Sequence, residues 1–135
     1  MSTPTSTSEY LLLFRRTDWD RNLSPEEAQK VIGKFMGWME RLTKEGKFKG
    51  GQPLENEGRV VTGKNGRNVA DGPFAESKEA IGGYFLLTVD SLEEAVEIAQ
   101  QNPLLEHGLI VEVRPVAKQC ATMKRLGVEY ATAVA

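Results

Sequence analysis

The fold of this chain is decided by two short runs, Tyr10-Leu-Leu-Leu-Phe14 and Gly83-Tyr-Phe-Leu-Leu-Thr-Val89. Both runs are almost continuously apolar, and both have the length of a β-strand rather than that of a helix. Because successive side chains of a strand point to opposite faces, a continuous apolar run predicts a strand that is buried on both faces. The two runs therefore predict the central strands of a sheet.

A helix with a clear start follows each predicted central strand. The starts are two capping boxes, Ser24-Pro25-Glu26-Glu27 and Ser91-Leu92-Glu93-Glu94, in which serine and glutamate satisfy the first backbone N–H groups. Gly46 predicts a left-handed cap at the end of the first helix, and Asn102-Pro103 predicts the end of the second. Apolar residues recur at helical spacing and predict one core-facing stripe on each helix. The stripes are Ala28, Val31, Ile32, Phe35, Met36, Met39 and Leu42, and then Leu92, Ala95, Val96 and Ala99.

The weaker strand candidates fall where the edges of a sheet would lie. Glycine and proline interrupt residues 48–54, which predicts an irregular edge strand. Apolar and polar residues alternate over residues 109–114, as in a half-exposed strand. Residues 59–70 predict a hairpin around Asn65-Gly66, since both turn residues must accept a positive φ.

The order strand, helix, strand, inserted hairpin, strand, helix, strand predicts an α+β, ferredoxin-like fold (βαββαβ with an inserted β-hairpin). Its antiparallel sheet has two helices on one face. We expect a disordered N-terminal tail over residues 1–9, a domain over 10–116 and a C-terminal extension over 117–135, weakly helical around residues 119–126. Since two helices cover only one face of the sheet, a second copy is expected to cover the other in a homodimer. The C-terminal extension is the alternative cover.

Composition predicts one soluble globular domain. The chain has 135 residues, of which 40% are hydrophobic and 27% charged. Seventeen basic and nineteen acidic residues give a net charge of −2, which provides no basic surface for nucleic acid. No apolar run reaches the roughly 18 residues that a membrane helix needs. Cys120 is the single cysteine, which excludes an internal disulfide and indicates a reducing compartment, so we expect a cytoplasmic protein.

Cofactor sites have little support in the sequence. His107 is the single histidine, so a histidine-rich metal cluster is excluded. A solvated loop histidine is the ordinary interpretation of this residue, and a catalytic role is the alternative. Residues 58–65 resemble a phosphate-binding loop, but Asn65 stands where serine or threonine must hold magnesium. We therefore expect no metal, nucleotide or other cofactor.

The strongest candidate for a binding site is the segment Asp71-Gly-Pro-Phe-Ala-Glu-Ser-Lys-Glu79. Asp-Gly-Pro predicts a tight turn, and Phe74 is expected to anchor it to the core. Glu76, Lys78 and Glu79 then place two carboxylates and an ammonium group within four residues. Ordered loops beside a rigid sheet often carry binding groups, although a solvated charged loop would also account for the charges.

This segment also carries a family resemblance. Together with Gly82-Gly-Tyr-Phe85 and Val111-Glu-Val-Arg-Pro115, it resembles the DGPF-type branch of the YCII-related proteins, from about Tyr10 to Val116. The resemblance implies a ferredoxin-like fold in a dimeric α/β barrel-type assembly, with a cleft beside the sheet. Broader relatives are similar to small-molecule enzymes with a histidine–aspartate acid–base pair. Some members of the branch are associated with extracytoplasmic-function sigma factors.

The chain departs from the enzyme pattern of these relatives at both positions of the pair. The family histidine lies in the first helix, where this chain has Lys34-Phe-Met-Gly-Trp38. The family aspartate precedes a proline after the second helix, and here Asn102 precedes Pro103. Neither half of the acid–base pair is carried over.

These observations lead to two hypotheses. The first is a YCII-like small-molecule binding protein or enzyme with its cleft beside the 71–79 loop, where a desolvated carboxylate would act as general base in isomerase- or lyase-type proton transfer. The second is a non-catalytic partner domain linked to sigma-factor transcription. The candidate catalytic residues are Asp71, Glu76 and His107, and the candidate ligand-binding residues are Arg15, Phe74, Lys78 and Glu79.

Overall fold

The computed structural model describes residues 8–72 and 79–128. The strands are β1 (Ser8–Arg15), β2 (Phe48–Pro53), β3 (Arg59–Thr62), β4 (Asn68–Asp71), β5 (Ile81–Val89) and β6 (Ile110–Pro115). The helices are α1 (Pro25–Lys44), α2 (Leu92–Gln100) and α3 (Ala121–Arg125), with short 3₁₀ helices η1 (Lys64–Gly66) and η2 (Pro103–His107). None of the described helices has the length and apolarity needed to cross a bilayer.

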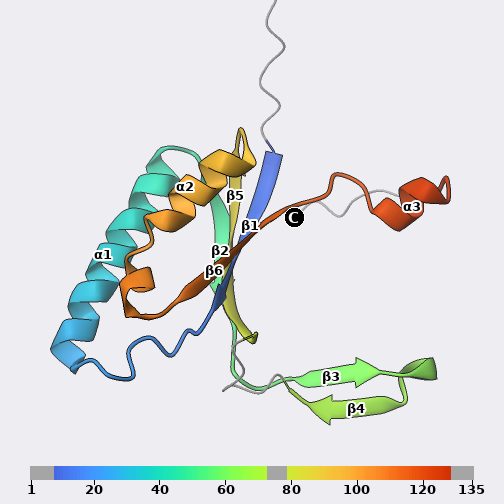
Figure 1. The fold of residues 1–135 in the computed structure, drawn as a ribbon, viewed down its shortest axis with the longest axis horizontal. Helices are drawn as coiled ribbons and strands as arrows, with labels where there is room; N and C mark the ends of the chain where they lie inside the picture. The colour runs from blue at the N-terminus through green and yellow to red at the C-terminus, as the bar shows by residue number, and fades with distance from the viewer. Residues whose placement is uncertain (1–7, 73–78, 129–135) are drawn as a thin grey trace, which may run out of the picture.

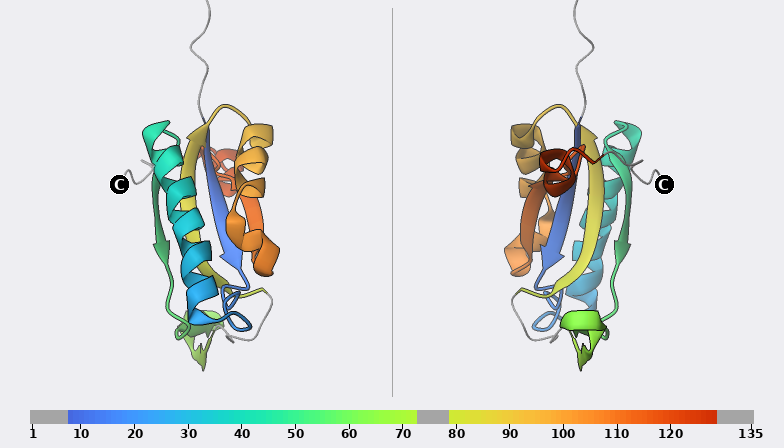
Figure 2. Two further views of the ribbon diagram at one scale, coloured as in Figure 1. Left: turned by 90° about the vertical axis from the view of Figure 1, so that its left-hand side faces the viewer. Right: turned by 90° about the vertical axis from the view of Figure 1, so that its right-hand side faces the viewer.

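Four strands form one antiparallel sheet in the order β2-β5-β1-β6, so the two apolar runs are its central strands, as predicted. Both long helices lie on one face of this sheet (Figure 1; Figure 2). The order of elements and the strand order are those of a ferredoxin-like α+β fold. Strand β1 begins at Ser8, two residues before the apolar run.

The inserted hairpin forms around the predicted turn. Strands β3 and β4 pair with each other in a separate two-stranded sheet. Asn65 and Gly66 have φ angles of 61° and 64°, the left-handed conformation that the turn requires. The hairpin projects from the lower end of the main sheet, away from the helices (Figure 1).

The core between helices and sheet is centred on Phe85 in β5. Its ring contacts four other aromatic rings, with centroid distances between 4.6 and 5.7 Å. The partners are Phe14, Phe35, Trp38 and Phe48. Trp38 stacks on Phe85 and is only 2% exposed. Trp38 therefore belongs to the core, although the predicted stripe of α1 left it out.

The predicted helix stripes are partly wrong. Ile32 and Met36 in α1 are 48% and 52% exposed, and Leu92 and Val96 in α2 are exposed as well. Adjacent residues of a helix are separated by 100° around its axis. A helix that turns Trp38 toward Phe85 therefore turns Ile32 and Met36 to its flank. Ile98 in α2 is buried in place of Leu92 and Val96.

The two helix starts are capped in different ways. In α1 both halves of the capping box are present, since Ser24 Oγ accepts from the Glu27 N–H and Glu27 Oε1 accepts from the Ser24 N–H. At α2, Ser91 Oγ accepts from the Glu94 N–H, but the Glu94 carboxylate accepts from the Asp90 N–H, one residue earlier than predicted.

Glu94 also forms an ion pair that ties α2 to the start of β2. Its Oε2 lies 3.1 Å from Nζ of Lys47. The Asp90 N–H and then Lys47 lower the pKa of Glu94. The Glu94 and Glu45 carboxylates in turn raise the pKa of Lys47.

Replacement of this carboxylate should destabilise the fold in a pH-dependent way. A lowered pKa in the folded state gives stability that is present above the unfolded value, about 4.3 for glutamate, and lost as the pH falls through the folded value. Glu94→Gln should therefore lower the thermal unfolding midpoint at neutral pH and have a much smaller effect near pH 3. The exposed control Glu97→Gln should change the midpoint little at either pH. An effect of Glu94→Gln that is equal at both pH values would contradict this account.

Candidate functional site

The residues predicted to form the loop site are only partly within the described chain. Phe74, Glu76 and Lys78 lie outside the described residues. Asp71 is the last residue of β4, and its exposed carboxylate lies 3.4 Å from the Arg59 guanidinium across the hairpin.

Arg15 and Glu79, both predicted to bind ligand, come together. Arg15 Nη1 lies 2.8 Å from Oε2 of Glu79, and Arg15 Nη2 lies 3.7 Å from Oε1 of Glu112. The Arg15 side chain is 19% exposed, and its Nε has no hydrogen-bond partner among the described residues. Two carboxylates of the chain already neutralise this guanidinium, so it is a weak candidate for binding an anion.

His107 lies apart from the hairpin. It is the half-buried last residue of η2 in the helical layer, with its ring 6.3 Å from that of Trp19. Asp71 belongs to the hairpin on the other side of the sheet (Figure 1). The structure therefore does not bring these two predicted catalytic residues into one site.

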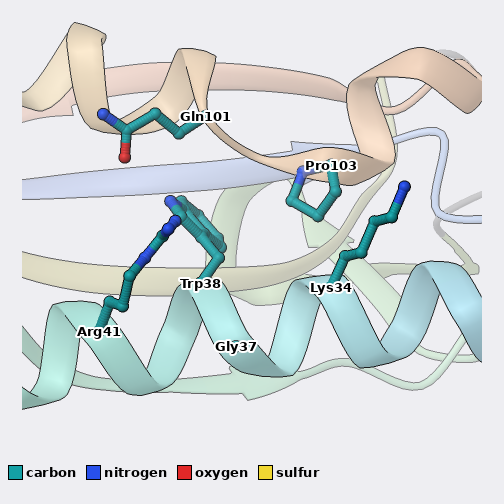
Figure 3. A pocket seen from close by; sticks show the side chains of 6 residues that line it. All are labelled: Lys34, Gly37, Trp38, Arg41, Gln101 and Pro103. Atoms are coloured by element: carbon teal, nitrogen blue, oxygen red, sulfur yellow. The ribbon is translucent and has the colours of Figure 1, made fainter.

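A pocket opens instead between α1 and the connection from α2 to η2. Its volume is about 420 Å³, within the range of small-molecule sites. Lys34, Trp38 and Arg41 rise from α1 toward the chain that carries Gln101 and Pro103 (Figure 3). The lining residues are Lys34, Gly37, Trp38, Arg41, Gln101 and Pro103.

Local sequence features explain both walls of this pocket. Positions 34, 37, 38 and 41 are three or four residues apart and share one face of α1. On the opposite wall, Pro103 prevents α2 from continuing, and Asn102 Oδ1 caps η2 by accepting from the Leu104 N–H at 2.9 Å. Gly37 leaves space on the α1 wall, because no atom from outside its own stretch of helix lies within 4 Å of where its Cβ would stand.

Two buried N–H donors, one on a lining residue and one on a residue between two lining residues, lack an acceptor in the described chain. Trp38 and Asn102 are each only 2% exposed, and neither Trp38 Nε1 nor Asn102 Nδ2 has a hydrogen-bond partner within residues 8–72 and 79–128. An unpaired buried donor costs about 1–3 kcal/mol, so two such groups near one pocket call for an explanation. Arg41 lines the same pocket and extends from α1 on the side of Trp38 (Figure 3), which adds a cationic donor to the pocket.

The charge of the pocket has one sign. Lys34 and Arg41 are its charged lining residues, and both are exposed cations. In the described chain no carboxylate lies within 4 Å of either group. Cationic groups and N–H donors without nearby carboxylates form a site for an anion. Nowhere in the described residues do three potential metal ligands cluster.

Sequence reasoning missed this pocket, although part of its signal was visible. The spacing of Lys34, Trp38 and Arg41 on one helix face can be read from the sequence. The burial of Asn102 and the approach of η2 to α1 depend on tertiary packing and have no local signal. The first departure from the enzyme pattern, residues 34–38, contains three lining residues of this pocket, and the second, Asn102, stands between the lining residues Gln101 and Pro103.

Residues 9–118 match the YCII-related domain. A search of curated proteins found no match. Among solved structures, a hypothetical protein of Arabidopsis thaliana is similar with 14% identity and a TM-score of 0.37, over 89% of this chain and 96% of that one.

A stability measurement can test, without a ligand, whether the indole N–H of Trp38 is unpaired in the folded chain. Trp38→Phe keeps an aromatic ring on Phe85 but removes the indole N–H. The packing lost with the larger indole ring and the cost no longer incurred by burying an unpaired N–H should nearly cancel in the free energy of unfolding. We expect a change of about 1 kcal/mol or less in the free energy of unfolding, against the roughly 3–5 kcal/mol typical of Trp38→Ala. Urea denaturation measures both. If Trp38→Phe costs as much as Trp38→Ala, the indole N–H bonds within the fold and the pocket loses its donor.

Proposed function

The chain belongs to the YCII-related family, and on this premise we propose that it binds a small organic anion in the pocket between α1 and the α2–η2 connection. The observation that carries the proposal is a pair of buried N–H donors in or next to a pocket whose charged lining residues are two cations. Trp38 Nε1 belongs to a lining residue, and Asn102 Nδ2 belongs to the residue between the lining residues Gln101 and Pro103. A ligand that only accepts hydrogen bonds would satisfy donors that the described part of the chain leaves unpaired.

A carboxylate or phosphate fits these groups better than a neutral ligand does. Hydrogen bonds to a charged group contribute about 1.5–3 kcal/mol, more than bonds between neutral groups. The planar guanidinium of Arg41 can bind two oxygens of one anion at once, and Lys34 supplies a second positive charge at the other end of the pocket (Figure 3). The side chain of Arg41 is exposed and can turn to let an oxygen reach the indole N–H.

The family relationship supports a ligand site at this pocket, with different chemical groups from those of the broader relatives. The resemblance places the acid–base pair of the broader relatives at residues 34–38 and at Asn102. Residues 34–38 contribute to one wall of the pocket, and the neighbours of Asn102, Gln101 and Pro103, line the other. Trp38, Lys34 and Asn102 offer donors in place of an imidazole and a carboxylate. We therefore propose binding, without proton transfer, at this pocket.

We further propose that the chain falls within the DGPF-type branch, which rests on the motif of residues 71–79. The position of Asp71, the first residue of that motif, does not support a proton-transfer role. Its side chain is 90% exposed and is paired with Arg59, whereas a general base in a cleft would be desolvated.

A matched pair of probes tests the charge requirement. Benzoate and benzamide have nearly the same shape, and only benzoate is an anion. Isothermal titration should show benzoate, or phenyl phosphate as a second anion, binding at least tenfold more tightly than benzamide, as expected from about 1.4 kcal/mol or more of charge-assisted bonding. Equal affinity of the three probes, or no binding of either anion, would show the proposal to be wrong.

Variants of the lining residues locate the binding. Arg41→Gln and Trp38→Phe should each weaken anion binding about tenfold or more, because the first removes a positive charge and the second removes an N–H donor. Lys30→Gln removes an exposed cation of α1 that does not line the pocket and should leave the affinity within about twofold. Equal losses in all three variants would indicate general attraction to positive charge rather than a pocket.

A further inference from the structure

We infer that the pocket between α1 and the α2–η2 connection selects an elongated ligand with an anionic group at each end, and that Lys34 binds the second group. The inference rests on the proposed anion site and specifies the class of anion that this site takes.

The two cations of the pocket stand at separate places along α1. Lys34 and Arg41 are seven residues apart, which is two turns of helix and about 10 Å of rise along its axis. In Figure 3 their side chains lie apart, Arg41 on the side of Gln101 and Lys34 on the side of Pro103. A single carboxylate or phosphate is much shorter than this spacing. An anionic group bound by Arg41 in this arrangement therefore leaves Lys34 without a partner.

The carboxylates nearest to Arg41 in the sequence are engaged with other cations. Glu40 pairs with Lys44 at 3.2 Å, and Glu45 pairs with Lys47 at 3.3 Å. Within residues 8–72 and 79–128, neither cation of the pocket has a carboxylate within 4 Å. Two cations without an internal partner in one pocket are complementary to a ligand with two negative charges.

Gly37 leaves room for the part of the ligand between its charged ends. It stands three residues after Lys34 and four before Arg41, so it shares their face of α1. In the described chain, no atom from outside its own stretch of helix lies within 4 Å of where its Cβ would stand. On the opposite wall, Pro103 lines the pocket with an apolar ring. A slender or flat hydrocarbon segment fits between these two uncharged residues.

A ligand with one charge would bind less well than a dianion of the same shape. Its neutral end would face the Lys34 ammonium group and displace water from it without replacing the lost hydrogen bonds. A second anionic group would instead form a charge-assisted hydrogen bond with Lys34. The pocket is therefore expected to distinguish ligands by the charge at the end that lies away from Arg41.

Three substituted benzenes test this preference by isothermal titration of the full chain. Terephthalate has a carboxylate at each end, 4-carbamoylbenzoate has the same shape with one carboxylate, and phthalate has two carboxylates side by side. Terephthalate should bind at least about tenfold more tightly than either of the others, because only terephthalate reaches both cations with a charge.

A fourth probe, 4-phosphonobenzoate, distinguishes the two kinds of anionic group. Tighter binding of this probe than of terephthalate would indicate a phosphoryl group at one end of the ligand. The reverse order would indicate two carboxylates, and both orders support a ligand with two anionic ends.

Two pairs of variants assign the preference to the pocket. In Lys34→Gln, terephthalate and 4-carbamoylbenzoate should bind within about threefold of each other. Lys30→Gln, which removes an exposed cation of α1 outside the pocket, should keep the tenfold preference. Gly37→Leu should weaken terephthalate binding about tenfold or more. Gly33→Leu, at an equally open helical glycine that does not line the pocket, should leave it within about twofold.

The outcomes separate this inference from the proposed function. Equal affinity of terephthalate and 4-carbamoylbenzoate would overturn the inference while the anion site stands, as would a preference that persists in Lys34→Gln. Equal affinity of terephthalate and phthalate would also overturn it, because total charge and not its spacing would then decide. If none of the four probes binds, the proposed function and this inference are both wrong.

Discussion

A four-stranded sheet whose central strands are apolar on both faces cannot be covered by two helices, and the rest of this structure follows from that constraint. The helices pack where Leu12 and Leu87, both 0% exposed, meet the aromatic rings around Phe85. The positions of the side chains between the sheet and the helices then depend on how α1 and α2 pack together on that face. The opposite face is left with half-buried leucines and a tyrosine, a pattern typical of surfaces that bind another chain.

The pocket is a product of the same packing. Trp38 stacks on Phe85 with one side of its ring, and the burial of that ring takes its N–H away from water. Asn102 follows α2, and its Oδ1 accepts the Leu104 N–H at the start of η2. Its amide N–H groups have no partner in the described chain. The core therefore places one unsatisfied donor in the pocket that Lys34 and Arg41 line, and a second between two of its other lining residues. A ligand that pairs with them would stabilise the fold in proportion to its occupancy, which links binding to stability.

The sequence predicts what local patterns control, and it fails where tertiary packing decides. The strand runs, the Ser24 and Ser91 caps and the Asn65-Gly66 turn are local, and the structure has each of them. The orientation of α1 is not local, so helical spacing alone predicts Ile32 and Met36 in the core and omits Trp38. The motif of residues 71–79 favours a site at that loop, whereas the sequence marks the pocket only through departures from the enzyme pattern at residues 34–38 and at Asn102. Asn102 is informative only once its burial is known.

The central claim is that a bound anion accepts the indole N–H of Trp38, and an NMR titration observes that atom directly. The chain has two tryptophans, and Trp38→Phe assigns their two indole N–H signals. With saturating benzoate, the account predicts that the Trp38 signal moves downfield as its hydrogen bond forms, while the Trp19 signal stays in place. A Trp38 signal that does not move while benzoate saturates the protein would contradict the account.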